Sequence, residues 1–168
     1  SPDPADGRVP SPARLGDLAA IQALAVAYAH AVDDRDWVRW ESLFDPHGFV
    51  DYRSAGGIAG SPAEVAAWMP DAMSVFTFCL HSISTHEIRF HEDDRATPRL
   101  HVFNRNGVDW EGTAELVDVS AIYHDEYLRR DDRWTIHRRV EQTLVVDGGR
   151  FAEVVRSLMP PLDGEATP

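Results

Sequence analysis

Helical patterns fill the first part of this chain and strand-like patterns fill the rest, and that order leaves few folds open. Residues 15–32 repeat apolar side chains every three or four positions, as a long amphipathic helix does. Beyond residue 80 the side chains alternate instead, and we expect four strands, at residues 81–90, 97–104, 114–129 and 134–146. Helices followed by a meander of long antiparallel strands predict an α+β fold.

Local signals indicate where the elements begin and turn. Ser11, followed by a proline, is typical of a helix N-cap. Ser61 and Glu64 match a capping box, which predicts a third helix. Residues 130–133 (RDDR) predict a hairpin turn between the last two strands. A short second helix is expected to bury Trp37, Trp40, Leu43 and Phe44, and a short strand is expected at 49–53. A strongly bent sheet wrapped on the first helix would form a cone with a pocket inside.

Length and composition suit a globular domain. The chain has 168 residues, of which 43% are hydrophobic. We expect a flexible arm at 1–10, a single domain at 11–160 and a flexible tail at 161–168, because both ends are rich in proline, glycine and acidic residues. No apolar run approaches the roughly 20 residues of a spanning helix, and residues 1–10 do not resemble a signal peptide, so a cytoplasmic location is expected.

The charge of the chain bears on its partners. The formal net charge is -12, and the 16 basic residues are all arginine. An acidic chain repels phosphate backbones and anionic membranes, so nucleic acid and membranes are not expected as partners. The arginine-only usage indicates a GC-rich bacterial genome.

The last strand carries an arginine that needs an explanation. Strict alternation places Arg138 and Gln142 on one face together with the apolar residues Trp134, Ile136, Val140, Leu144 and Val146. It gives the opposite, solvated face Thr135, His137, Arg139 and Glu141. An arginine on an apolar face is costly unless it is paired or meets a ligand. Arg138 is therefore either a member of a buried ion pair or an anchor for an anion or carbonyl group, and both interpretations stay open.

The preceding strand places Val117, Val119, Ala121 and Tyr123 on one face. Tyr123 should point to the core or to the pocket. We favour a packed tyrosine whose hydroxyl group is bonded to a neighbour.

Asp33 and His81 form the most interesting candidate pair. Asp33 ends the first helix, where the helix dipole disfavours a negative charge. His81 begins a strand after an apolar run. A carboxylate bonded to one ring nitrogen would fix the tautomer and make the other nitrogen a better base. The alternatives are that Asp33 is a solvated helix stop and that His81 is a satisfied core histidine.

A family resemblance favours the catalytic interpretation. Tyr28, Asp33, Asp36-Trp37, Leu43-Phe44, Tyr52, His81, Tyr123, Asp125, Trp134, Ile136 and Arg139 together resemble the pattern of the SnoaL-like family, whose fold is the cystatin-like fold of nuclear transport factor 2. Within it the chain is most similar to the group of scytalone dehydratase, bile-acid 7α-dehydratase and hexachlorocyclohexane dehydrochlorinase. The resemblance implies a cone-shaped α+β barrel, with a curved antiparallel or mixed sheet wrapped on the N-terminal helix. It also implies an Asp–His dyad at Asp33 and His81, with no metal and no organic cofactor.

The resemblance also assigns residues around the dyad. Tyr28 and Tyr52 match tyrosines of the pocket, Cys79 matches a cysteine before the histidine, and Arg138 matches an inward arginine. We therefore predict Asp33, His81 and Tyr28 as catalytic residues. The predicted substrate-binding residues are Tyr52, Arg138, Tyr123, Cys79, Trp40 and Phe49. No metal site is expected, because His81, His86 and His91 are spaced by five and alternate between the faces of a strand.

The predicted function is that of a dehydratase-like lyase acting on a hydrophobic, polycyclic or polyketide-like hydroxy-carbonyl compound, such as a steroid or polyketide of secondary metabolism. An isomerase or polyketide cyclase of the same fold is the alternative within enzymes. A non-catalytic module for small-molecule binding or dimerisation is the alternative outside them. A homodimer or homotrimer is expected, since relatives assemble through the sheet and the outer strand faces carry Ile122, Leu128 and Val145.

Overall fold

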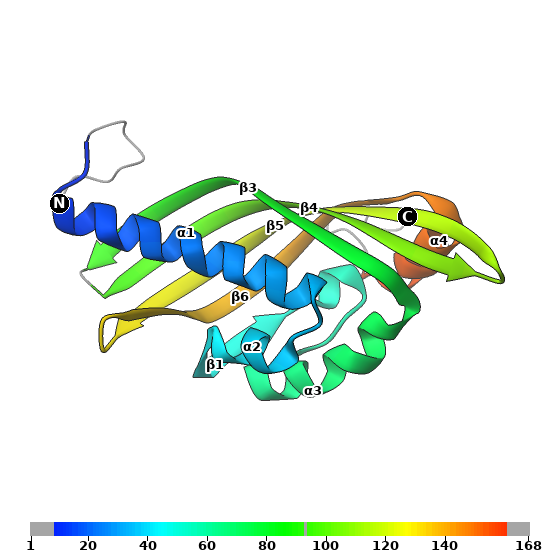
Figure 1. The fold of residues 1–168 in the computed structure, drawn as a ribbon, viewed down its shortest axis with the longest axis horizontal. Helices are drawn as coiled ribbons and strands as arrows, with labels where there is room; N and C mark the ends of the chain where they lie inside the picture. Colours follow the sequence, from blue (N-terminus) through cyan, green and yellow to red (C-terminus); the bar gives the residue numbers. More distant parts are fainter. Residues whose placement is uncertain (1–8, 93, 161–168) are drawn as a thin grey trace, which may run out of the picture.

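The computed structural model describes residues 9–92 and 94–160, and Figure 1 shows the arrangement of its elements. The first part holds α1 (Pro12–Asp33), α2 (Trp37–Ser42), β1 (Phe44–Asp51), the short 3-10 helix η2 (Arg53–Ala55), β2 (Ala59–Gly60) and α3 (Pro62–Ala72). After the 3-10 helix η3 (Met73–Val75) come β3 (Phe76–Glu92), β4 (Arg95–Trp110), β5 (Thr113–Arg130), β6 (Arg133–Asp147) and α4 (Gly149–Leu158). The predicted order of helices and strands is confirmed, and α4 was missed. The predicted arm and tail lie outside the described residues, apart from Val9 and Pro10.

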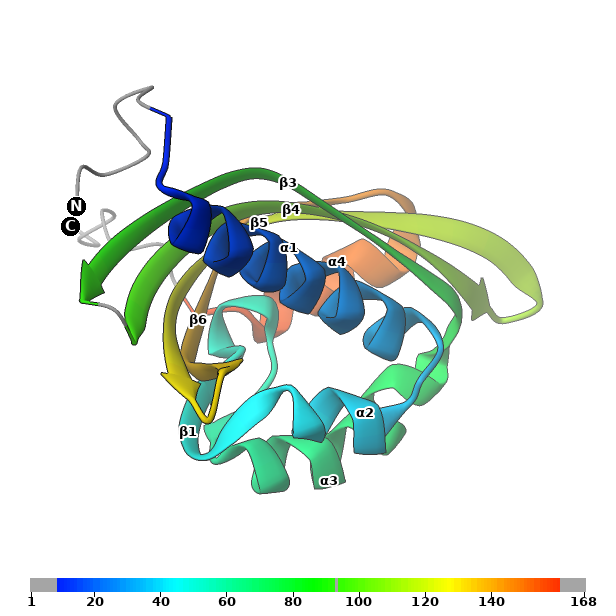
Figure 2. The same ribbon diagram turned by 60° about the vertical axis from the view of Figure 1, so that its left-hand side comes forward.

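The strands form one mixed sheet with the order β2-β1-β6-β5-β4-β3. Neighbouring strands are antiparallel, except that β1 runs parallel to β6. The sheet is strongly curved, and α1 lies across its concave side while α2 and α3 lie below it (Figure 2). The expected cone-shaped α+β fold is confirmed. The sheet itself stays open, with β2 and β3 as its edges.

Helix α1 begins and ends as its sequence predicts. The side chain of Ser11 accepts a hydrogen bond from the backbone N–H of Arg14, and Asp33 is the last helical residue. The buried side of the helix consists of Arg14, Ile21, Leu24, Ala25, Tyr28, Ala31 and Val32. The helix packs against β3, and this contact places Asp33 beside His81 of that strand.

By length and composition alone, the 22-residue helix α1 could cross a membrane, although no spanning helix was expected from the sequence. The described structure gives it another role. Ile21 and Ala31 are fully buried against the sheet and Tyr28 is 2% exposed, as in the core helix of a soluble protein.

The hairpin turn and the helix cap predicted from the sequence are present in the structure. Asp131 and Asp132 have φ angles of 49° and 57°, which are the left-handed values of a two-residue hairpin turn. The capping box at Ser61 and Glu64 is present at the start of α3. Several boundaries were wrong. Helix α2 ends at Ser42 and Phe44 begins β1, so the strand expected at 49–53 starts earlier. Strands β3 and β4 extend beyond the expected 81–90 and 97–104 at both ends.

Two irregularities in β6 reverse the predicted faces of this strand. Tyr127 pairs with Ile136 and Glu126 pairs with Arg138, so His137 is an extra residue in β6. Beyond this bulge the buried residues are Arg139, Glu141 and Thr143, whereas Arg138, Gln142 and Leu144 are exposed. A second shift near Leu144 returns Val146 to the interior. The prediction that Arg138 points inward and that Arg139 and Glu141 are solvated was therefore wrong.

Candidate active site

Asp33 and His81 lie in direct contact at the C-terminal end of α1. Oδ1 of Asp33 is 2.6 Å from Nδ1 of His81. Both carboxylate oxygens also accept hydrogen bonds from the backbone N–H of His81 at 3.1 Å. The side chain of His81 is 7% exposed and that of Asp33 is 17% exposed. This arrangement places the proton on Nδ1 and leaves Nε2 as the basic atom of the ring.

His81 lines a cavity of about 340 Å³ between the sheet and the helices, and Asp33 contacts the histidine without belonging to the lining. The lining is mostly apolar and includes Val32 from α1, Met69 from α3, Val119 from β5 and Phe151 from α4. The polar residues of the lining are Tyr28, Tyr52, His81, Asn104, Asn106, Tyr123 and Glu141. A few polar groups in an apolar cavity are typical of a small-molecule site.

Three buried tyrosines meet in this cavity. The hydroxyl oxygen of Tyr28 lies 2.7 Å from that of Tyr52 and 3.4 Å from that of Tyr123. The rings of Tyr28 and His81 are in edge contact, with centroids 6.4 Å apart. Burial raises the pKa of Tyr52 and of Tyr123, and the neighbouring Tyr28 raises both further. The hydroxyl groups of Tyr52 and Tyr123 therefore stay protonated at neutral pH and can donate hydrogen bonds.

The guanidinium group of Arg139 packs against the rings of two of these tyrosines. Its guanidinium carbon lies 4.0 Å from the ring centre of Tyr28 and 4.2 Å from that of Tyr123. Its Nε and Nη2 donate to the two carboxylate oxygens of Asp125 at 3.0 Å and 2.6 Å, and both side chains are fully buried. Burial lowers the pKa of Arg139, but the charge of Asp125 and its hydrogen bond raise this pKa by more than burial lowers it. The net pKa is raised, so the arginine stays charged.

Comparisons with known proteins identify the family of this chain. The family model described as "SnoaL-like domain" matches residues 13–140. This chain belongs to the SnoaL-like family. An uncharacterized protein of Mycobacterium tuberculosis is a relative with 31% identity over 132 residues, which are 78% of this chain and 88% of that protein.

Two solved structures show how far the SnoaL-like fold is shared. A scytalone dehydratase candidate from Novosphingobium aromaticivorans has a TM-score of 0.71 at 19% identity, covering 80% of this chain and 89% of its own. A hexachlorocyclohexane dehydrochlorinase from Novosphingobium barchaimii has a TM-score of 0.71 at 21% identity, covering 82% of this chain and 93% of its own. At these identities the likeness concerns the fold, which is that of nuclear transport factor 2. The chain thus has a fold that also serves lyases.

Several residues predicted for the site of this SnoaL-like protein lie elsewhere. Arg138 is exposed, and its guanidinium lies 5.8 Å from the ring centre of Phe49, which is itself 38% exposed. Trp40 is fully buried in the core, where its ring stacks near that of Phe44, and it does not line the cavity. The prediction that Arg138, Trp40 and Phe49 line the pocket was therefore wrong.

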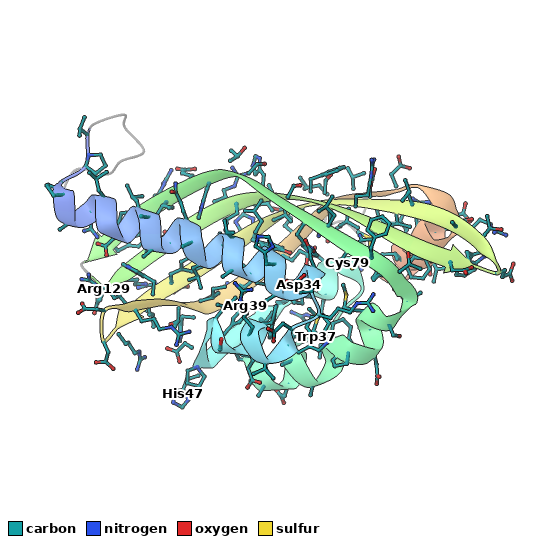
Figure 3. All side chains as sticks on the ribbon, viewed as in Figure 1. Asp34, Trp37, Arg39, His47, Cys79 and Arg129 are labelled. Carbon is teal, nitrogen blue, oxygen red and sulfur yellow. The ribbon has the colours of Figure 1, made fainter. Side chains whose placement is uncertain are left out.

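Cys79 is also outside the cavity lining. It lies on β3 near the end of α1 (Figure 3), buried and two residues before His81. Burial raises the pKa of its thiol to about 11, although Arg35 opposes this shift. The thiol is therefore neutral at physiological pH, as expected of a packed rather than a reactive cysteine.

Three polar residues of the cavity were missed by the sequence analysis. Asn104 pairs with His81 across β3 and β4, is 8% exposed, and its Oδ1 has no hydrogen-bond partner among the described residues. Asn106 is 4% exposed and donates to the carbonyl oxygen of Val117. Glu141 is 9% exposed. The alternation of β4 could have indicated both asparagines, but the bulge at His137 concealed Glu141.

Proposed function

We propose that this SnoaL-like protein is a cofactor-independent lyase of the dehydratase type. The observation that carries the proposal is the 2.6 Å contact between Nδ1 of His81 and Oδ1 of Asp33 at the wall of an apolar cavity. Asp33 orients the imidazole ring and stabilises the imidazolium ion that forms when Nε2 takes a proton. Such a pair is suited to removing a proton from the carbon next to a carbonyl group.

Neighbouring side chains are suited to stabilise the enolate oxygen that results. In the proposal, the hydroxyl groups of Tyr28 and Tyr52 donate hydrogen bonds to it, in an environment where water is scarce. The role of holding negative charge, which was expected of Arg138, is assigned to Arg139 in this proposal. Its buried charge lies against the rings of Tyr28 and Tyr123 and stabilises negative charge nearby.

The cavity supports a hydrophobic substrate of moderate size. A volume of about 340 Å³ falls in the range of small-molecule sites. Apolar walls from α3, the sheet and α4 favour fused rings over an open polar chain. The proposed substrate is therefore a polycyclic or polyketide-like hydroxy-carbonyl compound.

The test uses a bicyclic β-hydroxy ketone as a probe. 3-Hydroxy-α-tetralone has an acidic carbon next to its carbonyl group and loses water to form α-naphthol, whose fluorescence reports the reaction. We expect the purified protein to accelerate this loss of water without added metal or cofactor. Binding of the tetralone without formation of α-naphthol would contradict a lyase and favour a binding module.

We also propose that the protein is a cytoplasmic homodimer or homotrimer. Apolar side chains are exposed on the face of the sheet turned away from α1, among them Leu80, Phe103, Leu116 and Val145, which are 44% to 55% exposed. Of the residues expected there, Val145 is 51% exposed but Ile122 is 8% exposed. Light scattering should give two or three times the chain mass of 18.8 kDa at micromolar concentration, and a single chain mass would contradict the proposal.

A further inference from the structure

Glu141 is a buried carboxyl group that the dyad mechanism leaves without a role. It lies on β6 beyond the bulge, is 9% exposed, and belongs to the cavity lining. Among the described residues that line the cavity, it is the only carboxyl group. Burying a carboxyl group is unfavourable unless a specific interaction or a function compensates, so its position requires an explanation.

The surroundings hold this carboxyl group in place. The hydroxyl group of Thr143 donates to Oε1 of Glu141 at 3.2 Å. Ser54 donates its hydroxyl proton to the carbonyl oxygen of Glu141 at 2.7 Å, and the N–H of Thr143 donates to Ser54 Oγ at 3.1 Å. These bonds join Ser54 of η2 to β6 at Glu141 and Thr143. The side chain is therefore positioned by its neighbours rather than free to turn.

The charge state of Glu141 suits proton donation near neutral pH. Burial raises its pKa to about 7, while the hydrogen bond from Thr143 and the charge of Arg139 act in the opposite direction. The charge of Glu141 contributes to the raised pKa of Tyr52, which follows β1, and of Tyr123 on β5. The hydroxyl groups of both tyrosines are therefore neutral. Because burial raises the pKa of these two phenols, Glu141 is a stronger acid than either of them.

Dehydration needs a second proton transfer. When His81 removes the proton on carbon, the C–H electron pair moves into the enolate. As the carbonyl group re-forms, this pair makes the C=C bond and the C–O bond to the leaving group breaks, its electrons going to the leaving oxygen. Hydroxide is a poor leaving group, so the departing oxygen needs a proton at that moment. Asp33 and His81 lie at the β3 side of the cavity, whereas Glu141 lies on β6, with β4 and β5 between them.

We propose that Glu141 donates this proton to the leaving oxygen, which departs as water. The inference rests on the proposed function and adds a second catalytic residue to it. After one turnover His81 is an imidazolium and Glu141 is a carboxylate. Loss of one proton to solvent and gain of another restore both groups, so the cycle is balanced and needs no oxidant or reductant.

Two probes that differ only in the leaving group test the inference. 3-Hydroxy-α-tetralone must lose hydroxide with a proton, whereas 3-chloro-α-tetralone loses chloride, which needs none, and both give α-naphthol. Rates are corrected for the uncatalysed reaction. The test variant is Glu141→Gln, whose amide oxygen can still accept the bond from Thr143. The control is Glu126→Gln on β5, where the glutamate pairs with Arg95 at the surface.

We expect Glu141→Gln to lower kcat/KM for the hydroxy probe by about 10²-fold, as for the loss of a general acid, and to leave the chloro probe nearly unchanged. In the unmodified protein, the ratio of the hydroxy rate to the chloro rate should fall as the pH rises through about 7, because Glu141 loses its proton. In Glu141→Gln this ratio should not depend on pH, and Glu126→Gln should match the unmodified protein.

The outcomes separate this inference from the proposed function. If Glu141→Gln changes both probes equally, or neither, Glu141 is not the proton donor, although the dyad mechanism stands. If the unmodified protein accelerates neither probe, the proposed function fails and this inference fails with it. Circular dichroism shows whether a variant that loses both reactions is still folded. If Glu141→Gln is misfolded, the pH dependence of the hydroxy-to-chloro ratio in the unmodified protein decides, and a ratio that does not change through about pH 7 would overturn the inference.

Discussion

Replacing His81 by alanine should lower kcat/KM for 3-hydroxy-α-tetralone by about 10²- to 10⁴-fold, the range of a lost general base. The fold should survive, because the carboxylate of Asp33 keeps the two hydrogen bonds from the backbone N–H of residue 81. Asp33→Asn should also lose most of the activity, since the imidazolium ion would lose its counter-charge.

The double variant tests whether the two residues act together. If Asp33 and His81 act as one unit, Asp33→Asn combined with His81→Ala should be hardly slower than His81→Ala alone. The control is His91→Ala, an exposed histidine on the same strand whose Nε2 bonds to Thr97. Normal turnover by His81→Ala, or an equal loss in His91→Ala, would refute the dyad.

Replacing Arg139 by methionine should lower the free energy of unfolding by about 3–5 kcal/mol, because it leaves the carboxyl group of Asp125 buried without its partner. Its neighbour Arg138 is the matched control. Arg138→Met removes an exposed arginine and should change the free energy by no more than about 0.5 kcal/mol. Urea unfolding of the two variants measures the difference.

A second replacement separates the buried charge from the loss of packing. Adding Asp125→Leu to Arg139→Met removes the unpaired carboxyl group, and the double variant should regain much of the lost stability. A larger loss in Arg138→Met than in Arg139→Met would mean that β6 does not have the bulge at His137.

The elements that the sequence predicts well are those whose signals are local. Ser11 caps α1, Ser61 and Glu64 cap α3, and Asp131 with Asp132 supplies the turn between β5 and β6. Each of these signals acts within a few residues, so neighbours in the chain suffice to recognise it.

The faces of β6 depend instead on contacts between strands. The bulge at His137 lies where Gly48 of β1 approaches β6: a Cβ atom on Gly48 would be 2.6 Å from the carbonyl oxygen of His137. Alternation along β6 cannot reveal an extra residue that is defined by its pairing partners. For this reason the prediction chose Arg138 where the structure buries Arg139, and it left Glu141 on the solvated face.

Helix α4 was missed for a different reason. Gly148 is its N-cap and Gly149 its first residue, with φ angles of 97° and 26°, so no local side chain caps the first turn. The backbone N–H groups of Arg150 and Phe151 donate instead to the carboxylate of Glu115, which is distant in the sequence. The helix is held by its contacts: Phe151 meets the rings of Phe76 and Trp110, and Arg150 pairs with Glu115. Long-range packing of this kind leaves little local signal.

The contact between Asp33 and His81 joins residues 48 positions apart. Residue types at the end of a helix and the start of a strand suggested it, and the family resemblance directed attention to the pair. Neither could give the distance, because the distance depends on how α1 lies against β3.

The central claim is that His81 removes a proton from carbon inside this cavity, and hydrogen exchange measures that step alone. α-Tetralone has the acidic carbon of the proposed substrate but no leaving group, so in deuterated water its exchange can be followed by NMR without any later step. The unmodified protein should accelerate deuterium uptake next to the carbonyl group, and His81→Ala should bring the rate down to that of the buffer. Exchange at the buffer rate with the unmodified protein, or undiminished exchange with His81→Ala, would contradict the claim.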